Sequence, residues 1–269
     1  GWKSVCALLE SLERTREKKQ RAAKLQKFWA WAERTVGRPF ANGETAVLLR
    51  LLHPLADARR YYLKERSLSE ACIQALGLSS RGAGAALRDW QEGGVAAAAS
   101  DDGGDGDDEM WGPRVGFTST VKGQGDLSAV IQSTIDERVG SLSGGAARRE
   151  LYLSDVDGAL TSLARRDARA ADDGRAAGRD VLRALLSRCT GVEAKWFVRV
   201  LLRDLRISGC GEQRDAYSGT WPRLIFDSFS EGLYVAYSWR GDLAAAAMAA
   251  EATRARGGGD ASAAAMPTS

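Results

Sequence analysis

The amino-acid sequence predicts an all-α protein. Apolar residues recur at intervals of three and four through most of the chain, which is the spacing of amphipathic helices. No alternating strand pattern persists, no repeat of fixed period occurs, and glycine or proline separates the periodic segments. With 269 residues, 44% of them hydrophobic, the chain is long enough for one large domain or two small ones with a buried core.

The first expected helical region covers residues 2–36. Its apolar residues form two sets at helical spacing, Val5, Leu8, Leu9 and Leu12, followed by Leu25, Phe28, Trp29, Ala32 and Val36. Seven Lys and Arg side chains lie between these sets, in residues 14–27. Gly37 and Pro39 end the region, since glycine and proline commonly stand between helices.

Two more helices are expected before residue 91. Residues 44–61 continue the helical pattern, with a break or kink near Pro54, because proline lacks the amide hydrogen and crowds the preceding turn. Residues 67–70 have the sequence of a capping box, and Gly77 is a typical stop. This combination predicts a short helix over residues 68–76.

Residues 91–125 differ sharply in composition from the rest of the chain. Gly, Ala and Asp dominate, and few large apolar side chains are present to offset the entropy of ordering, so we expect a disordered insert. Residues 101–109 carry six acids and no base. The net charge of +3 therefore divides into −6 for this segment and +9 for the remainder, an acidic insert on a basic body.

Helices are expected again after the insert. The periodic segments are 126–139, 154–166, 180–190 and 193–207, with a loop over 165–180 and an irregular Gly-rich stretch over 208–222. A last apolar set occupies residues 224–243, and residues 244–269 are expected to form a low-complexity tail. The sequence thus predicts one helical domain over residues 2–243, interrupted by the insert at 91–125 and followed by the tail 244–269.

The composition excludes several kinds of site. No apolar stretch approaches the roughly 20 residues of a membrane span. His53 precedes Pro54 at the end of an apolar run, which favours packing over catalysis, and Lys122 lies in a Gly-rich run without the strand that a nucleotide-binding lysine motif needs. We predict no catalytic, cofactor-binding or metal-binding residue, and we expect reduced thiols at Cys6, Cys72, Cys189 and Cys210, which form no C-x-x-C pair.

The segment 193–207 combines cations with large apolar residues. At about 100° per residue, its four cations fall within about 80° of the circumference of a helix, while Trp196, Phe197 and aliphatic residues occupy most of the rest. Such a helix is buried on three sides and presents one cationic strip, roughly 16 Å long, to solvent or a partner. A strip of that length reaches several phosphates of a DNA duplex. The four cations are Lys195, Arg199, Arg203 and Arg206.

A structural interpretation of these cations remains open at this point. Each one could instead pair with an acid on a neighbouring helix, such as Asp155 or Asp180. Periodicity places the four side chains on one face but does not say what covers that face. Trp196 and Phe197 are expected in the core under either interpretation.

The same segment carries a family resemblance. Residues 193–207, E-A-K-W-F-V-R-V-L-L-R-D-L-R-I, resemble the segment E-x-K-W-(I/V)-x-R-x-(I/L)-(I/L)-x-D-L-(K/R)-(L/I) of ATP-dependent DNA ligases of the DNA ligase IV type. Residues 49–54 and 59–65 are similar to that family's R-L-(I/L)-x-P and R-x-x-Y-x-(L/I)-K-E stretch. Residues 75–78, 87–90 and 153–164 continue in the same order. Residues 210–222 depart from the pattern as an insertion.

The resemblance implies a DNA-ligase-type N-terminal DNA-binding domain. That domain would grip duplex DNA at a nick or break through the phosphate backbone, in double-strand-break repair by end joining in the nucleus. The full-length enzyme would use ATP and Mg²⁺, and its partners would include end-joining proteins such as Artemis. The family's K-x-D-G lysine motif is absent from this sequence, so we expect this chain alone to be inactive in ligation.

Candidate DNA contacts follow from the cationic strip and the resemblance together. They are Lys195, Arg199, Arg203 and Arg206, then Lys64, and finally Arg165 and Arg166. The alternative is a helical protein-interaction module of the same fold without DNA-binding activity, and a less favoured one is a complete enzyme whose catalytic residues follow no familiar motif. Exposed cations on one strip favour DNA binding, whereas cations paired between helices favour the interaction module.

Overall fold

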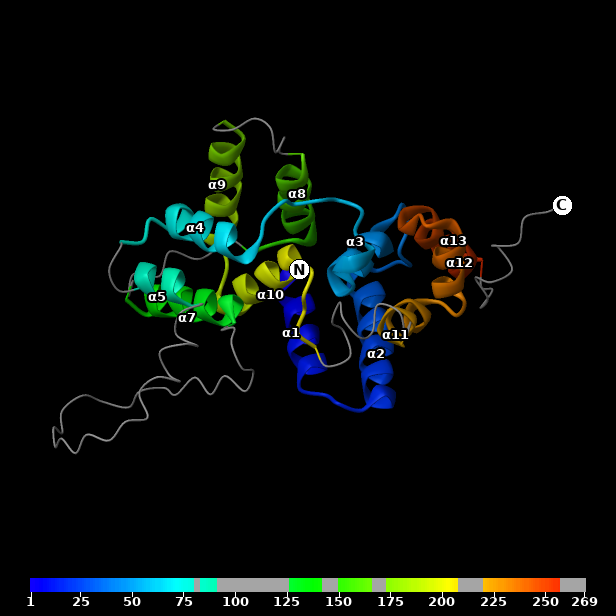
Figure 1. The fold of residues 1–269 in the computed structure, drawn as a ribbon. Helices are drawn as coiled ribbons and strands as arrows, with labels where there is room; N and C mark the ends of the chain where they lie inside the picture. The colour runs from blue at the N-terminus through cyan, green and yellow to red at the C-terminus, as the bar shows by residue number, and fades with distance from the viewer. Residues whose placement is uncertain (80–82, 91–125, 142–149, 166–172, 208–219, 257–269) are drawn as a thin grey trace, which may run out of the picture.

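The computed structural model describes residues 1–79, 83–90, 126–141, 150–165, 173–207 and 220–256. Every regular element in these ranges is helical and none is a strand, which confirms the all-α class. The helices form two groups on either side of helix α1 (Trp2–Glu13) (Figure 1). The insert predicted at 91–125 and the last residues of the predicted tail, 257–269, lie outside the described residues.

The first group packs helices from both ends of the chain. Helices α2 (Lys18–Val36) and α3 (Glu44–Leu52) lie beside α11 (Thr220–Phe229), α12 (Leu233–Arg240) and α13 (Leu243–Ala255). The ring of Trp29 meets those of Phe40 and Phe229 edge-on, with centroids 6.2 and 5.1 Å away. Its indole N–H donates to Ser228 Oγ at 2.9 Å, so the buried polar atom is satisfied.

Helix α13 joins this group through a buried carboxylate. Glu251 is 3% exposed and accepts hydrogen bonds from the backbone N–H groups of Gly43, at 2.9 Å, and Thr45, at 2.8 Å. The first N–H groups of a helix have no partner within it, so Glu251 caps the start of α3 from across the fold. The predicted low-complexity tail is therefore wrong for residues 244–255, which are helical and packed.

The second group contains the described helices from the middle of the chain. Helix α10 lies along α7, α9 packs against α4 and α8, and α5 packs against α4 and α7. The elements are α4 (Glu65–Leu76), α5 (Ala83–Asp89), α7 (Leu127–Ser141), α8 (Leu153–Ala164), α9 (Asp173–Leu186) and α10 (Gly191–Leu202). Helix α10 begins with a capping box, in which Thr190 Oγ1 accepts from the Glu193 N–H and the Glu193 carboxylate accepts from the Thr190 N–H.

Helix α1 connects the two groups. It packs against α2 on one side and α10 on the other, and the Trp2 indole N–H donates to the Glu193 carbonyl at 3.2 Å. A hydrophobic core runs through both groups. Trp196 and Phe197 lie in it with no exposed surface, as predicted from the sequence.

Several predicted boundaries are wrong. The helical region 2–36 is two helices, because the chain turns at residues 14–17 and brings Leu12 and Leu25 into the same core. The region 44–61 ends at Leu52, before the 3-10 helix η1 (Pro54–Ala56). Helix α4 begins three residues earlier than predicted, since Ser67 accepts from the Lys64 N–H and so stands at the third position of the helix.

The middle of the chain also differs from the prediction. Part of the loop expected over 165–180 is helix α9, which begins at Asp173, and helix α5 has no counterpart in the prediction. The apolar set at 224–243 divides among α11, α12 and the first residue of α13. Glycine or a short turn separates these three helices, and such breaks cannot be detected from hydrophobic periodicity alone.

Candidate nucleic-acid interface

The four cations predicted to share one helical strip do not share one helix. Helix α10 ends at Leu202, and Arg203 adopts the left-handed conformation with φ 59°. Arg206 lies beyond the helix and also has a positive φ, 51°. Only Lys195 and Arg199 are helical, so the predicted strip does not exist as one face of α10.

The prediction that these cations face outward is wrong for Lys195 and Arg199. Lys195 is 9% exposed and Arg199 5%, because α1 covers one side of α10 and α7 covers another. Their partners are acids, as in the structural interpretation, but not Asp155 or Asp180. Glu10 and Glu13 of α1 and Asp126 at the start of α7 supply the carboxylates.

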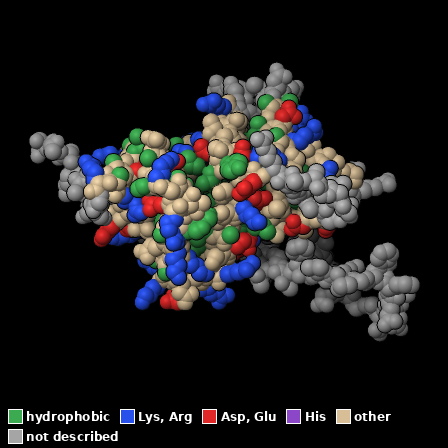
Figure 2. Space-filling model, turned by 180° about the vertical axis from the view of Figure 1, so that it is seen from behind, with side chains coloured by type: hydrophobic (Ala, Val, Ile, Leu, Met, Phe, Trp, Pro, Cys, Tyr) green, Lys and Arg blue, Asp and Glu red, His purple; other side chains and the backbone are tan. Residues whose placement is uncertain are grey.

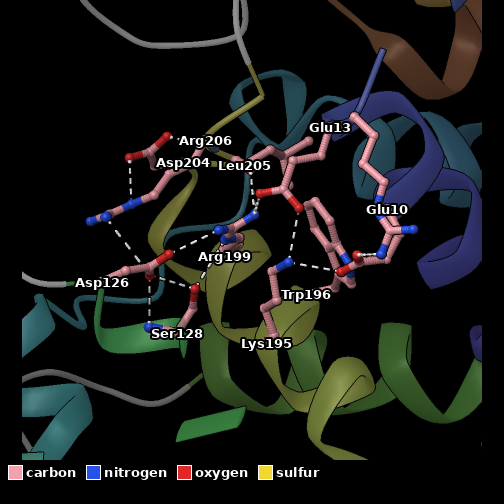
Figure 3. A network of polar contacts seen from close by, with 11 residues as sticks. Glu10, Glu13, Asp126, Ser128, Lys195, Trp196, Arg199, Asp204, Leu205 and Arg206 are labelled. Carbon is pink, nitrogen blue, oxygen red and sulfur yellow. Dashed lines mark hydrogen bonds and ion pairs between the residues drawn. The ribbon is translucent and has the colours of Figure 1, made fainter. Parts of the chain in front are cut away.

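The acids and bases form a continuous chain of ion pairs (Figure 3). Arg199 is its centre, with Nη1 2.6 Å from Glu13 Oε1 and Nη2 2.8 Å from Asp126 Oδ2. Lys195 Nζ lies 2.7 Å from Glu10 and 2.9 Å from Glu13, and Arg206 lies 3.4 Å from Glu65 and 3.7 Å from Asp126. In order, the members of this ion-pair chain are Arg14, Glu10, Lys195, Glu13, Arg199, Asp126, Arg206 and Glu65.

Hydrogen bonds and an aromatic ring complete the surroundings of Arg199. Its Nε donates to Ser128 Oγ at 3.0 Å, and Nη1 also donates to the Leu205 carbonyl at 3.2 Å. The guanidinium carbon lies 4.8 Å from the centroid of the Trp196 ring, and Trp196 donates to Glu10 at 3.0 Å. A buried cation with this many partners holds three segments of the chain together.

The ion pairs shift the pKa values of the acids. Burial by itself raises the pKa of Glu10, but hydrogen bonds from Lys195 and Trp196 and the nearby positive charges outweigh burial and hold that pKa below its ordinary value. Asp126 behaves in the same way, because Ser128, Arg199 and Arg206 outweigh burial and lower its pKa. Both carboxylates are therefore ionised at neutral pH and remain paired.

Arg203 takes part in a second buried cluster. It donates to the backbone carbonyls of Asp57, at 2.9 Å, and of Arg59, and its guanidinium lies 5.7 Å from the Tyr61 ring centroid. The Asp57 carboxylate accepts from Arg59 and from the Tyr61 hydroxyl at 2.6 Å. Arg203 therefore anchors the segment that precedes α4 instead of standing free for a ligand.

Exposed cations lie at the two ends of the ion-pair chain. At the Arg14 end, the turn between α1 and α2 and the first two residues of α2 expose Arg14, Arg16, Lys18 and Lys19, which we call the basic turn. At the Glu65 end, Arg60, Lys64 and Arg66 are exposed, and we call them the basic strip. Apart from Arg14, which lies 3.3 Å from Glu10, none of these seven has a carboxylate within 4 Å among the described residues.

The space-filling view shows the consequence for the surface. Lys and Arg side chains gather on the lower part of the face in Figure 2, at the level where Figure 1 places the turn between α1 and α2. The sequence contained the signal, since seven cations lie in residues 14–27. We did not identify these cations as a separate exposed cluster, because hydrophobic periodicity predicted one continuous helical region where the chain turns.

The remaining candidates have mixed outcomes. Lys64 is exposed and lies within the basic strip. Arg165 is exposed at the end of α8, and Arg166 lies outside the described residues. Their contacts with DNA stay predictions.

The other side chains singled out in the sequence serve packing. His53 is 7% exposed and lies against Phe226, with ring centroids 6.0 Å apart. Cys6, Cys72 and Cys189 are buried free thiols, and Cys210 lies outside the described residues. No described helix combines the length and apolar composition needed to cross a membrane.

Comparisons with known proteins give the following matches. Residues 2–214 match the family described as DNA ligase N terminus. The chain is 27% identical over 207 residues to DNA ligase 4 of Arabidopsis thaliana, and 24% identical over 214 residues to a putative DNA ligase 4 of Oryza sativa subsp. japonica. Each alignment covers 76% of this chain and 14% of the relative, so the chain spans a small part of the length of these curated relatives.

Proposed function

The chain belongs to the DNA ligase N-terminal family, and we propose that it binds duplex DNA through the basic turn and the basic strip. The observation that carries the proposal is the contrast between two kinds of cation. Those on α10 are buried and neutralised by acids, whereas those in the two exposed segments, apart from Arg14, have no carboxylate within 4 Å in the part of the chain that the structure describes. Exposed Lys and Arg side chains without carboxylate partners are the groups that phosphate oxygens can neutralise.

The exposed Lys and Arg side chains determine the mode of binding. Lys and Arg contact phosphates irrespective of sequence, so such a surface positions a domain on any duplex without selecting bases. This behaviour suits a protein that must act at breaks of any sequence. Among the predicted contacts, Lys64 then acts directly. Arg206 lies within 4 Å of Glu65, Asp126 and Asp204, so it contacts a phosphate only if it leaves these carboxylates. Arg165 is a further contact in this proposal, while Lys195, Arg199 and Arg203 are positioning residues.

The proposal extends to the whole protein through the relatives. On the basis of their printed name, DNA ligase 4, we propose that the chain is part of an ATP-dependent ligase of that type. End joining of double-strand breaks in the nucleus, ATP and Mg²⁺ as cofactors, and partners such as Artemis belong to this extended proposal. The described residues contain no group of three or more His, Cys, Asp or Glu side chains placed to hold a metal ion.

Binding to nicked duplex at several salt concentrations tests the DNA-binding proposal. The logarithm of the binding constant should fall linearly with the logarithm of salt concentration, by about 0.9 for each phosphate neutralised. The double variant Lys18→Glu/Lys19→Glu should lower this slope by about 1.8. Arg256→Glu, which changes an exposed cation at the end of α13, is the matched control and should leave the slope unchanged.

A second function is supported by a separate observation. Trp239, 82% exposed, and Val235, 39% exposed, lie one turn apart on α12 and present an apolar face. Together with the ion-paired cations of α10, this face supports the helical protein-interaction module. The same titration separates the two functions, because a module without DNA-binding activity gives no salt-dependent binding to nicked duplex in any variant.

A further inference from the structure

Tyr62 is an exposed aromatic residue inside the basic strip. Its side chain is 63% exposed, and it lies two residues after Arg60 and two before Lys64. Arg66, the third cation of the strip, follows in the first turn of α4. The preceding residue, Tyr61, is buried in the hydrophobic core. Packing in the core therefore explains Tyr61 but not Tyr62.

Tyr62 also has an unfavourable backbone conformation. Its φ is 50°, in the left-handed region, which a bulky residue rarely adopts because its Cβ comes too close to the following carbonyl oxygen. Residues of this kind persist where the surrounding structure holds them in place, and they are concentrated at active sites and binding sites. The strained backbone thus indicates that the position of the Tyr62 side chain matters for binding.

Hydrogen bonds hold the chain on both sides of Tyr62. Before it, the backbone carbonyl of Arg59 accepts from the side chain of Arg203. After it, the Lys64 N–H donates to Ser67 Oγ at 3.0 Å, at the start of α4. The tyrosine side chain has few rotatable bonds, so a ring mounted on an anchored segment loses little entropy when a ligand covers it.

The charges around the ring indicate the class of ligand. The three cations of the basic strip have no carboxylate within 4 Å among the described residues, and the acid between them in sequence, Glu65, lies 3.4 Å from Arg206. Surfaces that combine an aromatic ring with such cations bind single-stranded nucleic acid, because bases stack on the ring while the cations attract the phosphates. A ring flanked by exposed charges offers an apolar protein partner no continuous apolar patch.

We propose that Tyr62 stacks on an unpaired base at a DNA end while the cations of the basic strip neutralise the neighbouring phosphates. The proposal rests on the DNA-binding function proposed above and adds a ligand to it, the single-stranded segment at a break. Bases inside a duplex are stacked on their neighbours and offer the ring no free face. Stacking tolerates every base, so this contact selects for unpaired ends without selecting a sequence.

Two DNA ends that differ in their bases alone test the stacking. One is a duplex with a short single-stranded overhang, and the other is the same duplex with an overhang whose sugars carry no bases, so the number of phosphates is equal. The unmodified chain should bind the first more tightly by about fivefold or more, which is the contribution of one stacked base.

The same titrations separate this proposal from the DNA-binding proposal. Equal affinity for the two overhangs, with salt-dependent binding to blunt duplex retained, overturns the stacking alone. Absence of salt-dependent binding to any of these DNAs overturns both proposals.

Three variants assign the preference to the ring of Tyr62. Tyr62→Phe keeps the ring and should keep the preference for the overhang with bases. Tyr62→Gly removes the ring and should abolish the preference without lowering the melting temperature, because glycine adopts a positive φ readily, and without changing the salt slope, because no cation is lost. Tyr152→Ala, which removes a tyrosine 57% exposed directly before α8, is the matched control and should keep the preference. A preference retained by Tyr62→Gly, or lost in Tyr62→Phe, overturns the stacking.

Discussion

Arg199 and His53 are both buried ionisable side chains, and their surroundings have opposite effects on charge. Arg199 is 5% exposed but remains charged, because Glu13 and Asp126 lie within 2.8 Å of it and hold its pKa above the ordinary value despite burial. His53 has no carboxylate partner among the described residues, and its Nδ1 is buried without a hydrogen-bond partner. Burial alone lowers the pKa of His53 to about 4.

Removing the Arg199 charge should destabilise the fold strongly. Arg199→Met removes the cation nearest to both Glu13 and Asp126, which keep only Lys195 and the more distant Arg206, respectively. Breaking a buried pair typically costs about 3–5 kcal/mol. Urea unfolding followed by circular dichroism measures the loss. The matched control is Arg16→Met, which removes an exposed cation and should change stability by less than about 0.5 kcal/mol. If Arg199→Met costs less than about 1 kcal/mol, the buried ion pairs contribute no more to stability than ordinary surface ion pairs.

The free energy of unfolding should fall as the solution is acidified below pH 6.5. The folded pKa of His53 is about 4 against an ordinary value of 6.5, so the unfolded chain binds the proton first and gains stability relative to the folded chain. For this group the loss grows from pH 6.5 down to about pH 4, totals about 3 kcal/mol, and is then complete. Urea unfolding of the unmodified chain and of His53→Leu at several pH values isolates the contribution of His53. The variant should lack this part of the pH dependence.

The carboxylates add a second loss at lower pH. The pKa values of Glu10, Asp57 and Asp126 are all lowered in the folded state, where their cationic partners outweigh burial. Their stabilisation is complete above the ordinary carboxyl pKa and disappears as the pH falls through the folded values. His53→Leu should keep this acid-side loss. A variant with an unchanged slope between pH 6.5 and 4 would mean that His53 is protonated without penalty.

At the scale of the element, the sequence predicted helices better than it predicted where they end. Helix α10 is recognised from its periodicity, although the prediction began it at residue 193 and not at Gly191. Its end is not, because Arg203 adopts a left-handed conformation that normally favours glycine or asparagine. Helix α13 is missed for a different reason. Its buried residues are mostly alanines, among them Ala246, Ala247 and Ala250, which resemble low complexity until close packing against α3 is known.

Helix α13 should therefore be necessary for the stability of the first helix group. Deleting residues 243–269 removes the buried residues of α13 and the Glu251 cap on α3, whereas deleting 257–269 removes none of them. The shorter deletion should leave the melting temperature unchanged, and the longer one should lower it sharply. The point variant Glu251→Ala isolates the cap and should cost about 1–3 kcal/mol, because two backbone N–H groups lose their partner. Equal melting temperatures for both deletions would place the domain boundary at 243, as the sequence predicted.

At the scale of the whole molecule, the identity of the cations was predictable but their partners were not. The spacing of Lys195 and Arg199 places them one turn apart, which the structure retains. Glu10 and Glu13 are about 185 residues earlier in the chain, and no local pattern pairs them with α10. Such partners depend on how α1 packs against α10. The family resemblance, in contrast, was recognisable from the segment 193–207, and the match over residues 2–214 confirms it.

The buried ion-pair chain and the exposed cations of the basic turn should affect the salt dependence of DNA binding differently. Lys195→Met removes a cation that is paired with Glu10 and Glu13, so no phosphate contact disappears with it. Affinity for nicked duplex should fall, because α1 and the basic turn that follows it lose an anchor, but the salt slope should stay that of the unmodified chain. Lys18→Glu/Lys19→Glu should instead lower the slope by about 1.8. Equilibrium titrations at four salt concentrations, carried out where circular dichroism shows both variants folded, make the comparison. If Lys195→Met also lowers the slope by about 0.9, Lys195 leaves its carboxylates to bind a phosphate, and the outward-facing strip predicted from the sequence is restored.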